Sequence, residues 1–118
     1  MKRLAILLLG FALPGIAAAT DYQVQPASSQ LGFSAVFQGA SFDGHFTQWN
    51  AAISYDQADL AASKFEVEVT LASVKTGDSD RDSALPGKAF FDVAQFPVAR
   101  FVTTGFRRQG EQVIADGD

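Results

Sequence analysis

The residues best suited to chemistry gather in one segment of the sequence, residues 73–101. Acidic side chains surround Arg81, and phenylalanines follow them. These residues are Asp78, Asp80 and Asp82, then Phe90, Phe91, Phe96 and Phe101. A phenylalanine ring removes roughly 150–250 Å² from water when it is buried. We therefore expect this segment to close over something apolar.

Arg81 is the candidate for contact with a polar head group. A guanidinium at the lip of an apolar cavity can hold a phosphate through paired donors. The alternative is an internal network in which Arg81 pairs with Asp80, Asp82 or Asp92 and orders the loop. The sequence leaves both interpretations open.

The acidic cluster at 78–82 does not fit a calcium loop. An EF-hand loop starting at Asp78 requires glycine at its sixth position and glutamate at its twelfth. Ser83 and Ala89 stand there instead. His45 is the single histidine and the chain has no cysteine, so no zinc site is predicted. We predict no metal and no cofactor.

Catalysis is poorly supported by the sequence. It contains no Gly-x-Ser-x-Gly elbow and no glycine-rich phosphate loop. The alternation of residues 42–47 places His45 opposite Phe42 and Phe46, on a water-facing side. We therefore predict no catalytic residue, and an enzyme acting through His45 or the cluster at 78–82 remains the alternative.

Residues 1–19 have the pattern of a cleavable export signal. Lys2 and Arg3 precede an apolar run, and small residues at 17–19 suit cleavage after Ala19. The apolar run is shorter than the roughly 20 residues of a transmembrane helix. Residues 20–118 would then form one domain with 7 basic and 13 acidic side chains. Such an acidic domain is unsuited to nucleic acid or an anionic membrane surface as its main partner.

The rest of the chain alternates with period two, which predicts strands. Phe65, Val67 and Val69 share one face of a strand at 64–71, and further strands are expected at 31–37, 42–47, 51–55, 100–106 and 112–116. Gly39 suits a hairpin turn, and 109–110 suits another. A short helix is predicted between Asp78 and Lys88, capped by Asp78 or Ser79.

Many short antiparallel strands predict an all-β fold, a sandwich or an up-and-down barrel. A barrel of about eight strands can be filled by its side chains or can hold one ligand. The residues alone do not decide between these. Because the last strand would end in an exposed edge, we expect the chain to be part of a longer product.

Several motifs together resemble the YceI-like, or polyisoprenoid-binding, family. They are the opening block at 22–33, Gly44-His45-Phe46, Ser73-Val74-Lys75-Thr76-Gly77, Arg81-Asp82-x-x-Leu85, Phe90-Phe91-Asp92, Phe96-Pro97 and Phe101. The resemblance implies a lipocalin-like antiparallel β-barrel that receives a long isoprenoid chain, such as a polyprenyl phosphate or a quinone tail. It also implies export to the periplasm and a link to stress responses.

Our sequence-based hypothesis is a periplasmic protein that sequesters or carries an isoprenoid-type amphiphile. The predicted interior residues are Phe33, Phe37, Phe46, Phe65, Val67, Val69 and Phe101, with Phe90, Phe91 and Phe96 closing one end. Transient contact with a membrane or a membrane protein is compatible with this hypothesis. The alternative is a non-enzymatic, stress-related interaction protein with a filled barrel.

Overall fold

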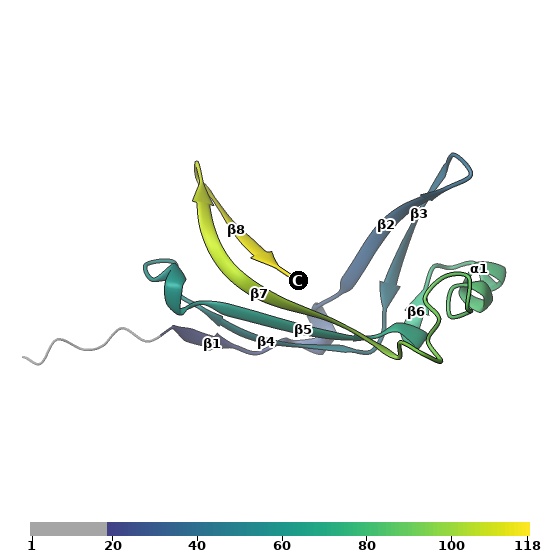
Figure 1. Cartoon of the computed structure of the whole chain (residues 1–118), viewed down its shortest axis with the longest axis horizontal. Helices are drawn as coiled ribbons and strands as arrows, with labels where there is room; N and C mark the ends of the chain where they lie inside the picture. The colour runs from purple at the N-terminus through teal and green to yellow at the C-terminus, as the bar shows by residue number, and fades with distance from the viewer. Residues whose placement is uncertain (1–18) are drawn as a thin grey trace, which may run out of the picture.

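The computed structural model describes residues 19–118, so the predicted export signal, apart from Ala19, lies outside the described residues. Two antiparallel sheets and a few short helices make up the described chain (Figure 1). The larger sheet has five strands in the order β1-β4-β5-β7-β8. Their bounds are Thr20–Tyr22, Trp49–Tyr55, Lys64–Thr70, Val98–Gln109 and Gln112–Gly117.

The smaller sheet has three strands in the order β2-β3-β6. Its strands are β2 (Leu31–Phe37), β3 (Ala40–Phe46) and β6 (Val74–Lys75). The helices are η1 (Pro26–Ser28), η2 (Leu60–Ala62), η3 (Leu71–Ser73) and α1 (Ser79–Ala84). The predicted all-β class with one short α-helix after Asp78 is confirmed.

The two hairpins rise from the same side of the long strands. Figure 1 shows β7–β8 curving upward at one end and β2–β3 rising toward the other, with α1 beyond β2–β3. Within residues 19–118, the two sheets do not close on each other through a continuous ladder of hydrogen bonds. The described residues therefore form an open arrangement of two sheets.

The alternation of β5 explains how the larger sheet divides its side chains. Val67 pairs with Phe101 of β7, which places both on one face. Glu66 and Glu68 point to the other face, where Arg100 lies 2.6 Å from Glu66 and 3.9 Å from Glu68. These ion pairs are exposed, so their contribution to stability is small.

An irregularity in β7 keeps two aromatic residues on the same face. Thr103 pairs with Gly117 of β8, and Gly105 pairs with Asp116, so Thr104 is an extra residue. A bulge of this kind reverses the alternation and bends the strand. Phe106 therefore shares the face of Phe101, and its ring lies 5.0 Å from the ring of Phe65.

The turn of the β2–β3 hairpin follows the sequence prediction. Gln38 and Gly39 have φ angles of 51° and 80°, and Phe37 pairs with Ala40 across the turn. A two-residue hairpin turn of type I′ has positive φ at both central positions, which glycine adopts without steric cost. The turn fixes the register that places Phe33, Phe42 and Phe46 on one face.

The most buried residues of the described chain lie where the two sheets meet. Val74 is 1% exposed, and Ser73 beside it is also buried. The Ser73 hydroxyl donates to the Thr70 carbonyl at 2.7 Å and accepts from the Gln48 amide at 3.0 Å. This joint ties the turn after β3 to the end of β5 and so sets the position of the β2–β3 hairpin.

None of the helices within residues 19–118 reaches the length and apolar character needed to cross a membrane.

Candidate functional site

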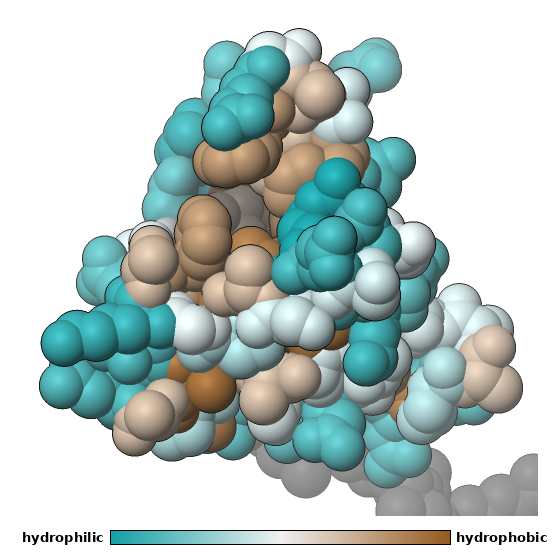
Figure 2. Space-filling view, turned by 90° about the vertical axis from the view of Figure 1, so that its right-hand side faces the viewer, coloured by the Kyte–Doolittle hydropathy of each residue, from teal (hydrophilic) through white to brown (hydrophobic). Residues whose placement is uncertain are grey.

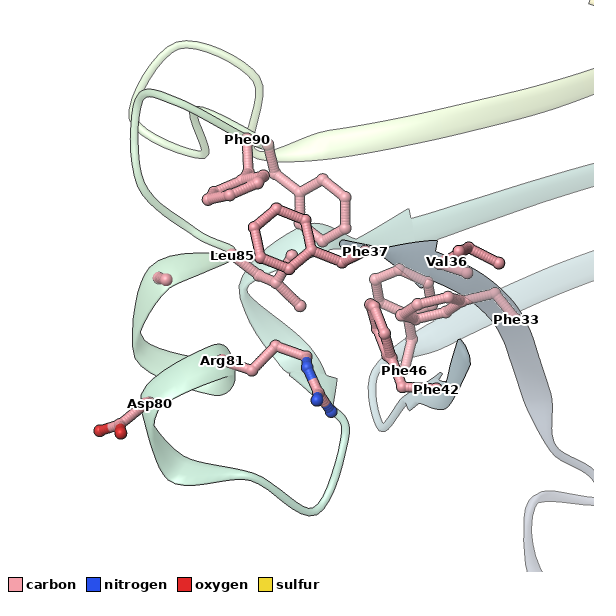
Figure 3. Close-up of a pocket in the computed structure, with 12 residues that line it drawn as sticks. Phe33, Val36, Phe37, Phe42, Phe46, Asp80, Arg81, Leu85 and Phe90 are labelled. Atoms are coloured by element: carbon pink, nitrogen blue, oxygen red, sulfur yellow. The ribbon is translucent and has the colours of Figure 1, made fainter. Parts of the chain in front are cut away.

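An apolar cavity of about 760 Å³ lies between the β2–β3 hairpin, helix α1 and the loop that follows it. Figure 2 shows brown, apolar atoms gathered around a hollow on this face, with teal atoms beside it. Figure 3 shows the side chains that line it. They are Phe33, Ala35, Val36, Phe37, Phe42, Phe46, Asp80, Arg81, Ala84, Leu85, Phe90 and Phe91.

Phenylalanine rings in contact form one wall of the cavity. The ring of Phe33 lies 6.2 Å from that of Phe42 and 5.5 Å from that of Phe46, and Phe46 lies 6.1 Å from Phe91. Such distances favour edge-to-face and tilted aromatic contacts. Phe33 pairs with Gly44 across the hairpin, and a side chain at Gly44 would overlap the Phe33 ring. The glycine therefore allows the ring to lie against the sheet.

Helix α1 forms the opposite wall and is held by its carboxylates. The Asp78 carboxylate accepts the backbone N–H of Arg81 at 2.9 Å and caps the helix, as predicted. The Asp82 carboxylate accepts from the Thr76 amide at 2.8 Å and from the Thr76 hydroxyl at 2.6 Å. Leu85, at the end of the helix, is buried and lines the cavity.

The environment of Asp82 favours its charged form. The hydrogen bond from the Thr76 side chain is the largest cause that lowers the pKa of this carboxyl below its usual value. The Thr76 amide and the positive charges of Lys75 and Arg81 lower the pKa further, while desolvation opposes them. Asp82 therefore connects α1, as a carboxylate, to Thr76, the residue that follows β6.

Arg81 extends from α1 toward the phenylalanine wall. Its guanidinium carbon lies 4.1 Å from the centroid of the Phe42 ring, a cation–π distance. Figure 3 shows Arg81 directed toward the rings and Asp80 directed away from them. No carboxylate of residues 19–118 lies within 4.0 Å of the Arg81 guanidinium. The predicted alternative, an Arg–carboxylate network, is therefore not formed in the described chain, and the Asp82–Thr76 contact orders the loop instead.

The structure brings together part of the predicted set of binding residues. Those that line this cavity are Phe33, Phe37, Phe46, Phe90, Phe91 and Arg81. Phe65, Val67, Val69 and Phe101 lie on the larger sheet outside it, and Phe96 is 59% exposed. A ligand contact by these five residues stays a prediction.

Sequence reasoning missed other lining residues, among them Phe42 and Leu85. The alternation of β3 would have indicated Phe42, because it shares a face with Phe46. In a regular strand Val36 and Phe37 lie on opposite faces, yet both line the cavity near the hairpin turn. The alternation gave no signal for Val36, because its place depends on how the end of the hairpin twists.

The other candidate chemistry is not assembled around this cavity. His45 lies on β3, where it pairs with Gly32 and Lys75. Across residues 19–118, no group of three His, Cys, Asp or Glu side chains is arranged to hold a metal ion. The lining of the cavity is apolar apart from Asp80 and Arg81.

Comparison with known proteins gives a family match over almost the whole described chain. The family model of the YceI-like domain matches residues 22–118. A UPF0312 protein of Pseudomonas savastanoi pv. phaseolicola is 39% identical over 116 residues, covering 94% of this chain and 60% of that protein. Protein YceI of Salmonella newport is 28% identical over 120 residues, covering 94% of this chain and 63% of that protein.

Solved structures share the fold. BcnA of Burkholderia cenocepacia aligns with a TM-score of 0.73 at 24% identity, covering 80% of this chain and 60% of BcnA. A Campylobacter jejuni YceI protein aligns with a TM-score of 0.59 at 27% identity, covering 83% of this chain and 58% of that one. The predicted lipocalin-like fold class is confirmed. The chain spans about 60% of the length of the curated relatives it matches.

Proposed function

Because this chain belongs to the YceI-like family, whose fold is known for binding polyisoprenoids, we propose that it binds an isoprenoid-type lipid in its phenylalanine-lined cavity. The bound lipid is sequestered or carried, and no chemical step is performed on it. The single observation that supports this proposal best is the cavity itself, because its phenylalanine side chains surround an unfilled volume.

The size and lining of the cavity suit the proposed ligand. Its volume of about 760 Å³ lies within the roughly 300–1,000 Å³ typical of small-molecule sites. Each methylene group moved from water into such a site contributes about 0.8 kcal/mol. A chain of several isoprene units therefore gains affinity from burial alone and needs few polar contacts.

The proposed location is the periplasm. The apolar run after Lys2 and Arg3 and the small residues at 17–19 support export by a cleavable signal. The absence of cysteine means that the protein needs no oxidative folding there. Amino-terminal sequencing of the protein recovered from a periplasmic fraction tests this part, and we expect Thr20 as the first residue.

The ligand is tested by mass spectrometry of organic extracts from protein purified without detergent. We expect a polyprenyl species or a quinone to co-purify. The Phe42→Ala variant removes a ring from the cavity and should recover less lipid per protein. Tyr22→Ala is the matched control, because Tyr22 is an aromatic residue that is 52% exposed and lies outside the cavity.

Extracts free of lipid, both before and after refolding with candidate isoprenoids, would contradict the proposal. They would favour the alternative, an interaction protein whose apolar residues meet a protein partner. Equal lipid recovery from wild type, Phe42→Ala and Tyr22→Ala would place the ligand elsewhere on the molecule.

A further inference from the structure

We propose that Arg81 restricts the ligand to amphiphiles that carry an anionic oxygen head group. This inference rests on the proposed function and names the class of ligand that the same cavity takes. The observation that carries it is a guanidinium without a carboxylate partner in the described chain, placed at the edge of an apolar cavity.

The lack of a partner is notable because carboxylates are close in sequence. Asp78 uses its carboxylate to cap α1 at the backbone N–H of Arg81. Asp82 accepts two hydrogen bonds from Thr76. Asp80 is directed away from the cavity, as Figure 3 shows. None of these three carboxylates forms an ion pair with Arg81, and the Arg81 charge reaches Asp82 only as a longer-range interaction.

The position of the guanidinium matters as much as its charge. Arg81 is half-buried, and its guanidinium carbon lies 4.1 Å from the centre of the Phe42 ring. The ring contact orients the group, while the N–H donors lie in the guanidinium plane and need an acceptor. A planar fork of donors matches the oxygens of a phosphate or a carboxylate.

The apolar surroundings increase the selectivity for an anion. Phe33, Phe42, Phe46 and Leu85 exclude water from one side of the site, so an anion there is less screened than in bulk solvent. A neutral alcohol or a quinone carbonyl accepts a hydrogen bond but brings no negative charge to a guanidinium that has no carboxylate within 4.0 Å in residues 19–118. Hydrogen bonds to charged partners are about twice as strong as neutral ones.

The test compares two probes that differ only in the head group, farnesyl phosphate and farnesol. Calorimetric titration of the wild-type protein at fixed ionic strength should give a dissociation constant at least about tenfold lower for farnesyl phosphate. Arg81→Gln should weaken farnesyl phosphate binding by about tenfold or more and leave farnesol binding unchanged. Palmitate, a third probe, distinguishes a general oxyanion site from a phosphate-selective one.

Arg100→Gln is the matched control, because it removes the same charge from the opposite face of the larger sheet. A general charge effect would weaken farnesyl phosphate binding equally in Arg100→Gln and Arg81→Gln, and would overturn the inference. Equal binding of farnesyl phosphate and farnesol by wild type would also overturn it, but would leave lipid binding intact. Failure of both probes to bind would instead contradict the proposed function. The wild-type comparison needs no variant and so stands even if Arg81→Gln does not fold.

Discussion

Gly44 makes space for one ring of the cavity wall. It pairs with Phe33 across the hairpin, and the Phe33 ring occupies the volume that a side chain at position 44 would take. The Gly-x-Phe motif therefore has a physical reason in this chain. The glycine lets Phe33 lie flat, and Phe46 places the next ring beside it.

We expect Gly44→Ala to reduce the free energy of unfolding by about 1–3 kcal/mol, the usual cost of an overpacked site. The added methyl group overlaps the Phe33 ring, which must move into the cavity. Urea denaturation measures the loss. Gly105→Ala is the control, since nothing lies within 4 Å of a methyl group there. A Gly44→Ala variant as stable as Gly105→Ala would show that the ring moves freely.

The contact between Asp82 of α1 and Thr76, the residue that follows β6, makes the position of α1 sensitive to acid. The folded protein lowers the pKa of Asp82 below its ordinary value of 3.8. Such a group stabilises the fold above its unfolded-state pKa, and the stabilisation is lost as pH falls through the lower folded-state pKa. The sensitive window therefore opens around the ordinary value of 3.8 and extends below it.

We expect the urea midpoint of the wild-type protein to fall more between pH 7 and pH 3 than that of Asp82→Asn. The asparagine side chain at position 82 binds no proton in this window, whereas the other carboxyl groups titrate in both proteins. Asp80→Asn serves as the control, because the Asp80 carboxylate makes no hydrogen bond within residues 19–118. If Asp82→Asn lost as much stability on acidification as Asp80→Asn and wild type, the Asp82–Thr76 contact would not be the acid-sensitive link.

At the scale of helices and strands, the long alternating strands were predictable, and so were the turn and the helix start that are marked by characteristic residues. The period-two pattern placed β2 and β5 with little error, and Gly39 and Asp78 marked the hairpin turn and the helix cap. The strands β1 and β6 were missed because three or two residues are too few to show a period. These segments are strands because they pair with β4 and β3, and such pairing between segments distant in sequence cannot be predicted from a local pattern.

The sequence also predicted which rings share a face but not which face encloses the cavity. Val67 and Phe101 were both predicted to line the interior, yet they pair with each other on the larger sheet, outside the cavity. Phe42 lies inside it, because the β2–β3 hairpin faces α1. The direction in which a hairpin leaves a sheet depends on contacts such as those of Ser73, which join segments distant in sequence.

At the scale of the whole molecule, a bound ligand should stabilise the fold, because the cavity is lined by segments that are far apart in the chain. Farnesyl phosphate at a concentration of 100 times its dissociation constant stabilises a folded state by about 2.7 kcal/mol. For a domain of about 100 residues this raises the Tm by about 10 °C or more. Differential scanning calorimetry measures the shift, and Phe42→Ala should show a smaller one. No shift at saturation would mean that the probe does not bind the folded state.

The bulge at Thr104 has a mechanical consequence. Its bend lets the single strand β7 pair with β5 along its first half and with β8 along its second, so β8 continues the larger sheet without an intervening loop. The β2–β3 hairpin is joined to that sheet by connecting segments before β2 and after β3. Under a force that widens the space between the hairpins, the continuous ladder of β7 resists and those connecting segments bend. The compliant side of the molecule is therefore the side that carries Phe33, Val36 and Phe37.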